Sequence, residues 1–173
     1  MRLELGRRAD YGIRAAIDLA RHHERGERRK AREIADEMDV PATYVPQVLA
    51  DLVRAGIAVS LAGPSGGYLL SRPPEQISLL AVIRAVDDDP GSRVCVLRGG
   101  PCRWDDSCAV HVLWFEAQQA MLGRLERATL AEAIEFDAAI DAGTVHERDH
   151  LAARADEPAT DPGQGAATAA PTR

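Results

Sequence analysis

The stretch AREIADEMDVPATYVPQVLADLVRAG, residues 31–56, decides the fold of this chain. Its apolar residues recur at helical spacing in two runs, which predicts a short helix at 31–38 and a longer one at 42–55. Pro41 separates the two runs, because proline lacks a backbone N–H and restricts the residue before it. Gly56 is expected to end the second helix. The stretch therefore predicts two helices joined by a tight turn.

The sequence on either side adds a third helix and a hairpin. Isoleucines and alanines fall on one face of a predicted helix at 11–24. Two short strand-like runs, 57–61 and 68–70, flank the stretch Gly63-Pro64-Ser65-Gly66-Gly67, which predicts a β-hairpin with a glycine-rich tip. Helix, helix, turn, helix and hairpin in this order form a winged helix-turn-helix. The predicted fold class is mainly α with a small β-hairpin.

The second half of the chain is predicted to contain three more helices. Ser78 is expected to cap a helix over 78–86. No periodic pattern holds from 94 to 108, and a long helix follows at 110–127. Thr129 begins a capping box that opens the last helix.

These patterns divide the chain into three expected parts. Residues 1–72 form the winged helix-turn-helix, and residues 73–142 hold a loop at about 87–111 together with the later helices. The tail, 143–173, is acidic and rich in Ala and Pro. Such a composition buries too little apolar surface to offset the entropy of ordering, so the tail is predicted to be largely disordered.

The composition is that of a globular protein outside the membrane. Of 173 residues, 46% are hydrophobic and 28% are charged. Arg14 and Asp18 interrupt the apolar residues near the start, which argues against a signal peptide. No apolar stretch approaches the ~20 residues that span a bilayer. A cytoplasmic location without membrane contact is expected.

The charge is distributed unevenly along the chain, whose formal net charge is −6. Residues 1–72 carry 12 Lys and Arg against 10 Asp and Glu, whereas residues 73–173 carry 9 against 17. A contact with a polyanion such as DNA is therefore expected in the first part. Solvated helix surfaces would explain this charge distribution equally well, so the DNA-binding interpretation needs the support of a motif.

The helix at 42–55 is expected to enter the major groove of double-stranded DNA with its first residues nearest the bases. Those residues include Thr43, Tyr44 and Gln47. The two hydroxyls can bond phosphate or base, and Gln47 can pair with adenine through two hydrogen bonds. The same elements could instead form a protein-docking or purely structural unit.

Phosphate contacts are expected around this helix. The hairpin tip has almost no side chains, so its backbone can approach the sugar–phosphate ridge closely. Arginines near the N-terminus can neutralise phosphates. The candidates for these contacts are Arg2, Arg7 and Arg8 and, in the hairpin tip, Gly63, Ser65, Gly66 and Gly67.

Three cysteines and a histidine lie close together after the hairpin. Six residues separate Cys95 from Cys102, five separate Cys102 from Cys108, and His111 follows after two more. An odd number of cysteines in a chain expected in the cytoplasm argues against disulfides. The intervening residues are polar and rich in glycine, so these thiols are not expected in a regular core. The pattern predicts a metal site, with three unrelated cysteines as the alternative.

Two kinds of metal centre fit these ligands. Structural zinc sites usually draw on cysteines separated by two to four residues, and this segment has no such pair. Its wider gaps favour an iron–sulfur cluster, either 2Fe-2S or 4Fe-4S, which can also accept a histidine. Zinc stays open as the alternative. Arg93, Arg98 and Arg103 would favour thiolates with either metal.

Enzymatic interpretations have less support, and the chain is expected not to be an enzyme. It has no Cys-x-x-Cys pair for thiol–disulfide chemistry. No Lys-Ser or Lys-Thr follows Gly67, so the glycine-rich tip is not a P-loop. A protein-interaction module built on the acidic C-terminal helices is a further alternative.

Over about residues 1–136 the chain resembles the iron–sulfur-cluster regulators of the IscR and NsrR type, a family of winged helix-turn-helix repressors. The matching stretches are Met1-Arg2-Leu3, Asp10-Tyr11-Gly12-Ile13-Arg14, Ile34-Ala35, Val40 to Val45, Leu52 to Gly56, Gly63 to Tyr68, the three cysteines, His111 to Trp114 and Thr129 to Glu132. The resemblance implies a homodimer joined by the long helix after the cysteines. It also implies a transcriptional regulator whose affinity for a pseudo-palindromic operator is set by a cluster that senses redox state, nitric oxide or iron–sulfur status.

The chain departs from the family pattern at three places. The first cysteine gap is one residue longer than in IscR-like proteins, Ala62 stands where relatives often have Arg, and Pro46 stands where some have a base-reading glutamate. These changes bear on the operator sequence more than on the fold. A winged-helix regulator with a zinc-bound or metal-free cysteine loop that senses another signal is the alternative function.

Two residues compete for the fourth ligand position. His111 matches the IscR-like arrangement and is expected one turn from Cys108 on the same helix, so both can face the cluster. Asp10 matches an Asp-Tyr-Gly pattern of the nitric oxide sensor, in which an aspartate of the partner's first helix reaches the cluster. We favour His111, because Asp10 has an ordinary alternative role as the N-cap of the first helix.

Overall fold

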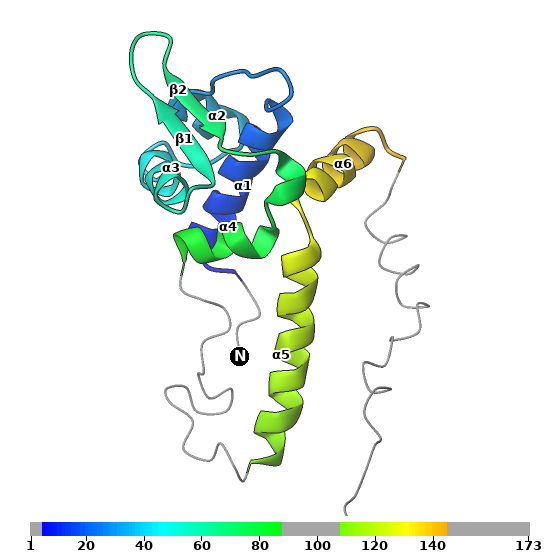
Figure 1. Cartoon of the computed structure of the whole chain (residues 1–173). Helices are drawn as coiled ribbons and strands as arrows, with labels where there is room; N and C mark the ends of the chain where they lie inside the picture. Colours follow the sequence, from blue (N-terminus) through cyan, green and yellow to red (C-terminus); the bar gives the residue numbers. More distant parts are fainter. Residues whose placement is uncertain (1–4, 88–107, 145–173) are drawn as a thin grey trace, which may run out of the picture. The chain divides into compact units, whose positions relative to one another are not determined.

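The computed structural model describes residues 5–87 and 108–144 of the 173. Helices dominate it, and its one sheet is a two-stranded antiparallel hairpin (Figure 1). The elements are α1 Arg7–Arg21, α2 Ala31–Glu37, α3 Val45–Arg54, β1 Ala58–Leu61, β2 Gly67–Leu70, a short 3-10 helix Pro74–Gln76, α4 Leu79–Val86, α5 Ala109–Arg127 and α6 Leu130–Asp141. The predicted fold class is confirmed.

The chain divides into two compact units, Met1–Glu135 and Phe136–Arg173. The first unit contains all elements from α1 to the beginning of α6. In the second unit, the rest of α6 ends in a turn in which the Thr144 hydroxyl donates to the Ala139 carbonyl at 3.0 Å. The predicted functional boundary at residue 72 stays a prediction.

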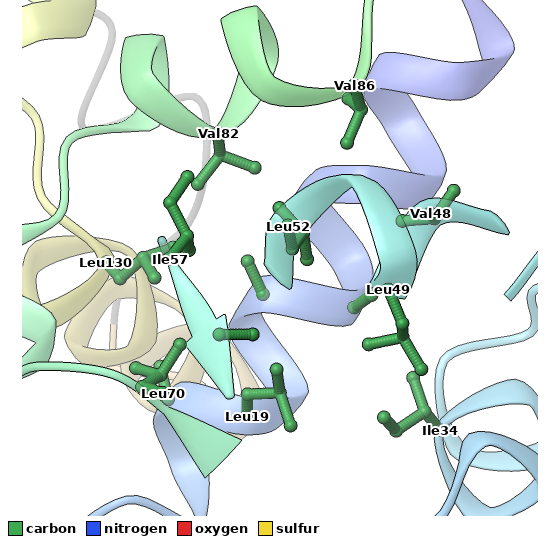
Figure 2. Packing of buried hydrophobic residues seen from close by; sticks show 14 of the residues in the cluster. Leu19, Ile34, Val48, Leu49, Leu52, Ile57, Leu70, Val82, Val86 and Leu130 are labelled. Atoms are coloured by element: carbon green, nitrogen blue, oxygen red, sulfur yellow. The ribbon is translucent and has the colours of Figure 1, made fainter. Parts of the chain in front are cut away.

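The core of the first unit lies where α1, α3 and α4 pack against one another. Ala15 and Ala16 of α1 are fully buried, and their small side chains let the neighbouring helices approach closely. Figure 2 shows larger aliphatic side chains filling this space, among them Leu49 of α3, which points toward Ile34 of α2. Burial of such side chains contributes roughly 1.5–3 kcal/mol each.

The turn between α2 and α3 makes the helix-turn-helix. Asp39 adopts a left-handed backbone with φ of 50°. The Val40 amide donates to the Ala35 carbonyl at 3.1 Å, which turns the chain back after α2. A further turn closes when the Tyr44 amide donates to Pro41 at 2.9 Å, so α3 begins at Val45 rather than at the predicted residue 42.

The wing is β1, β2 and the turn between them, residues 58–70. Ala58 pairs with Leu70 and Leu61 with Gly67. Gly63 has a φ of 101°, which favours glycine, and the Gly66 amide donates to its carbonyl at 2.9 Å. The predicted hairpin with a glycine-rich tip is confirmed.

Paired backbone segments join the start of α4 to the junction between α5 and α6. The Leu79 amide donates to Ala128 at 2.8 Å, and the Leu130 amide donates to Ile77 at 2.9 Å. The predicted caps of Ser78 and Thr129 are both present: each side-chain oxygen accepts from the amide three residues later. These contacts fix the C-terminal end of α5 beside α4.

For α1, which runs from Arg7 to Arg21, both predicted boundaries and the predicted cap are wrong. Helix α1 begins at Arg7, not at residue 11, and its N-cap is Gly6. Asp10 therefore lies within the first turn and is not the N-cap. Its carboxylate instead accepts a hydrogen bond from Arg14 Nε at 2.9 Å, which is an i,i+4 pair along the helix.

Among the helices that the structure describes, none is both long enough and apolar enough to cross a membrane.

Candidate nucleic-acid interface

The first turn of α3 presents its side chains to solvent. Thr43, Tyr44 and Gln47 are exposed, whereas Val45 and Val48 point into the core. Since the buried face of α3 fixes the helix against α1 and α4, its outer face is held rigidly in place. The three side chains predicted to meet DNA bases and phosphates are thus all exposed at the start of α3.

Tyr44 has a partner that the sequence did not predict. Its ring lies 5.5 Å from the ring of Tyr11 on α1, tilted by 47°. Such edge-tilted aromatic pairs are favourable and restrict the orientation of both rings. Tyr11 is half-buried. It therefore holds the Tyr44 ring at the start of α3, with half of Tyr44 left in solvent.

Arg8 forms an ion pair within the protein. It donates to Asp51 of α3, and Arg54 Nη1 donates to the other carboxylate oxygen at 2.6 Å. Burial of Asp51 tends to raise its pKa, but the hydrogen bonds and charges of both arginines outweigh burial and lower the pKa. About half of the Arg8 side chain remains exposed, so its role in phosphate contact stays a prediction.

A shallow pocket of about 380 Å³ lies at this ion-pair network. Arg8, Asp51 and Arg54 line one part of it, and Val86 and Asp87 at the end of α4 line another. The pocket thus joins α1, α3 and the point at which the chain leaves α4 toward the cysteines.

Asp51 is expected to make the stability of the protein pH-dependent. Because its folded pKa lies below the ordinary value, the ion pairs stabilise the fold at neutral pH, and this contribution is lost as pH falls through the folded pKa. Asp51→Asn should lower the free energy of unfolding by about 1–2 kcal/mol at pH 7. Urea unfolding at a series of pH values measures the difference.

The stabilities of the wild type and Asp51→Asn should converge only as pH falls through the lowered pKa of folded Asp51, where the carboxyl becomes protonated in the folded chain as well. Asp36→Asn, at an exposed i,i+4 pair with Arg32, is the matched control and should show little difference at any pH. A stability difference that stays constant from pH 7 to acid would contradict the role of the Asp51 charge.

The tip of the wing is compact and braced from outside. A Cβ on Gly66 would collide with the Leu61 carbonyl oxygen, and a Cβ on Gly67 would lie 2.8 Å from the Arg29 carbonyl oxygen. Arg28 Nη1 donates to the Ser65 carbonyl at 3.1 Å. Gly63 and Ser65 are exposed, whereas Gly66 is buried. The backbone approach to DNA predicted for this tip remains sterically open at Gly63 and Ser65.

Behind the wing, Arg29 forms a buried ion-pair network. Its Nε and Nη2 donate to the two carboxylate oxygens of Asp18 at 3.0 Å each, and Nη2 also donates to Glu37 at 2.8 Å. Hydrogen bonding to Asp18 is the main cause that raises the Arg29 pKa. This network connects α1, α2 and the strand-like residues beside β2. No spacing of residues in the sequence predicts this network.

The metal-ligand candidates are described only in part. Cys95 and Cys102 lie outside the described residues, as does Arg2 of the phosphate contacts. Cys108 is the N-cap of α5, and the His111 amide donates to its carbonyl at 3.0 Å, so the two residues are one turn apart as predicted. The His111 ring stacks on Phe115, with ring centroids 6.3 Å apart. Within 5–87 and 108–144, no three His, Cys, Asp or Glu side chains gather as a metal site.

Relatives of known name match most of the chain. The HTH-type transcriptional regulator IscR of Cronobacter sakazakii (strain ATCC BAA-894) is 31% identical over 148 residues, which are 86% of this chain and 88% of the relative. IscR of Serratia proteamaculans (strain 568) is 32% identical over 132 residues, which are 76% of this chain and 79% of the relative.

Solved structures share the fold at lower identity. T. potens IscR has a TM-score of 0.64 and 26% identity, covering 86% of this chain and 96% of its own. CymR (YrzC), the global cysteine regulator of B. subtilis, has a TM-score of 0.64 and 26% identity, covering 78% and 98%. The Rrf2 family, described as iron-dependent transcriptional regulators, matches residues 5–135. The chain therefore belongs to the Rrf2 family of DNA-binding transcriptional regulators.

Proposed function

We propose that this transcriptional regulator, acting as a repressor in the cytoplasm, has an operator affinity set by an iron–sulfur cluster. The observation that carries the cluster proposal is the position of Cys108 and His111 on one turn at the start of α5, directly after the segment with Cys95 and Cys102. The signal is redox state, nitric oxide or iron–sulfur status.

In this proposal α3 and the wing contact double-stranded DNA. Gln47 pairs with a base, Thr43 and Tyr44 bond phosphate or base, and the backbone from Gly63 to Gly67, Ser65 and Gly66 included, approaches the sugar–phosphate ridge. Arg2, Arg7 and Arg8 neutralise phosphates. The exposed first turn of α3 supports these roles.

The two candidate ligands that the structure describes, Cys108 and His111, are of types that bind iron–sulfur clusters. Cys108, the N-cap of α5, offers a sulfur donor. His111 offers an imidazole nitrogen whose ring is oriented by Phe115. A bound iron–sulfur cluster, 2Fe-2S or 4Fe-4S, would supply redox and nitric oxide chemistry at this position. Three cysteines and a histidine would also suit zinc, which the test below distinguishes.

The end of α4 offers a physical connection between the cysteine segment and α3. Val86 packs so closely on α1 that a Cβ on Gly12 would lie 2.6 Å from its Cγ2. Asp87 lies against Gly6, the N-cap of α1, and adds to the electrostatic stabilisation of Arg8. Arg8 in turn binds Asp51 of α3. A cluster bound after α4 can shift α1 and α3 only if it binds two states of the protein with different affinities.

We propose that α5 joins two copies of the chain. Its exposed apolar residues include Val110, Leu113 and Met121, which fall on one face at helical spacing. From 109 to 121 the helix carries one acidic residue, Glu116, and no Lys or Arg, so two copies can pack there with little charge repulsion. A two-fold dimer reads a pseudo-palindromic operator with half-sites about one helical turn apart.

Replacing Cys95, Cys102 and Cys108 together by Ala tests the sensor. The wild-type protein, purified without oxygen, should be brown or red, and the variant should be colourless. Operator affinity should differ between the two by about tenfold or more, because coupling between a ligand and a second site is typically worth 1–3 kcal/mol. Absorbance spectra and fluorescence anisotropy on a selected duplex measure both quantities.

Each part of the proposal can fail separately in this test. A colourless wild type with bound zinc would support the zinc alternative. Equal operator affinity of the coloured wild type and the triple variant would show that the cluster does not set DNA binding. Selection from random duplexes that enriches no sequence would contradict operator recognition itself.

His111→Ala and Asp10→Ala separate the two candidates for the fourth ligand. His111→Ala should bleach or alter the visible spectrum, because it removes a donor one turn from Cys108. Asp10→Ala should leave the spectrum unchanged and cost about 0.3–0.5 kcal/mol of stability, since it breaks only the surface pair with Arg14. The opposite pattern would assign the ligand role to Asp10.

A further inference from the structure

The wing has no charge of its own. Residues 58–70 contain no Asp, Glu, Lys or Arg. Phosphate groups are bound chiefly by Arg and Lys, because these neutralise the phosphate and release its counterions. An uncharged wing that approaches DNA would therefore need a cationic side chain from another part of the protein.

The connection between α1 and α2 lies along the wing and brings such a side chain. The Arg29 amide donates to the Tyr68 carbonyl at 3.0 Å, and the Tyr68 amide donates to the Arg29 carbonyl at 2.8 Å. These two bonds make an antiparallel bridge beside β2. A Cβ on Gly67 would lie 3.3 Å from Arg28 Cβ, so glycine at 67 permits this close approach.

Arg29 fixes the position of this connection. Its guanidinium is held by buried Asp18 and by Glu37, so its side chain points into the protein. Neighbouring residues in an extended segment point to opposite sides, and Arg28 is correspondingly exposed. Arg28 reaches the tip of the wing, where its Nη1 donates to the Ser65 carbonyl at 3.1 Å.

We propose that Arg28 is a phosphate-binding residue of the wing, contributed by the connection between α1 and α2. A guanidinium has five N–H donors, and the bond to Ser65 uses one of them. The others can bind a phosphate oxygen while the guanidinium stays in place at the wing tip. The inference rests on the proposed docking of the wing against DNA and is independent of any cluster.

Two substitutions separate this role from simple bracing of the wing. Arg28→Gln keeps an N–H donor for the Ser65 carbonyl but removes the charge. Arg28→Lys keeps the charge. Arg127→Ala, at the last residue of α5 and outside α3 and the wing, is the control that removes the same charge elsewhere.

The measurement is the binding of each full-length protein to a duplex that the wild type enriches from random sequences, from about 50 to about 200 mM salt. Arg28→Gln should weaken binding about five- to tenfold at about 0.1 M salt and make the slope of log K against log salt shallower by about 0.9 per bound protomer. Arg28→Lys and Arg127→Ala should keep the wild-type slope. The affinity for a duplex of unrelated sequence should fall by the same factor in Arg28→Gln, because phosphate contacts carry no sequence information.

Equal affinity and slope for Arg28→Gln and the wild type would overturn the inference and leave Arg28 as a brace. A loss of affinity with an unchanged salt slope would also overturn the inference. It would mean that the substitution alters the wing without removing a neutralised phosphate. Circular dichroism and the thermal unfolding midpoint should be unchanged in both variants. A wild type that enriches no duplex would instead contradict operator recognition, and the inference would fall with it.

Discussion

Asp18→Ala is expected to lower the free energy of unfolding by about 3–5 kcal/mol, because it leaves the buried Arg29 guanidinium without its main counter-charge. Asp18 is fully buried and accepts two hydrogen bonds from Arg29. After the substitution, Arg29 keeps Glu37, whose side chain is about half exposed and compensates the buried charge poorly. Chemical denaturation of the purified variant measures this loss.

The same substitution should also loosen the wing. Arg29 carries the backbone bridge to Tyr68, so a displaced guanidinium releases the segment beside β2. Hydrogen exchange at the Tyr68 amide should therefore become faster in Asp18→Ala than in the wild type.

Two further variants test the cause. Asp36→Ala breaks an exposed pair with Arg32 and should cost less than about 0.5 kcal/mol. The double variant Asp18→Leu/Arg29→Leu removes both charges and should recover part of the stability, since a buried pair can often be replaced by apolar residues. A loss below about 1 kcal/mol for Asp18→Ala would show that water or Glu37 already satisfies Arg29.

The secondary structure could be predicted because its signals are local. Helical spacing in 31–56 and glycines in 63–67 specify the helix-turn-helix and the wing within a few residues. The caps at Ser78 and Thr129 depend on bonds to amides only three residues away. Such features are determined by neighbouring residues, so the sequence carries them directly.

The candidate site could be predicted only in part, because its decisive contacts join distant residues. Arg8 and Asp51 are 43 residues apart, and Arg28 and Ser65 are 37 apart. No spacing rule connects such pairs, so the sequence predicts a phosphate contact for Arg8 but not its ion pair with Asp51. The cap assigned to Asp10 failed because α1 starts four residues earlier, at a position where Gly6 has an extended backbone but no side chain to mark it.

Leu113→Asp is expected to convert the proposed dimer into a monomer. Leu113 is 68% exposed, and Val110, Ala117 and Met121 lie on the same face of α5 at spacings of three, four and eight residues. A face of this kind is unusual on a monomer and fits a symmetric contact between two copies. The face that packs on the protein's own core is a different one, marked by Leu122.

In a two-fold contact Leu113 occurs twice, so a loss of about 2 kcal/mol at each copy raises the dimer dissociation constant about 1,000-fold. Operator affinity should fall with it, because a monomer holds one half-site. Gln119→Asp adds the same charge on the opposite face of α5 and is the matched control. Sedimentation equilibrium measures the oligomeric state, and anisotropy measures operator binding. If Leu113→Asp stays dimeric and binds the operator as tightly as the wild type, α5 does not form the dimer interface.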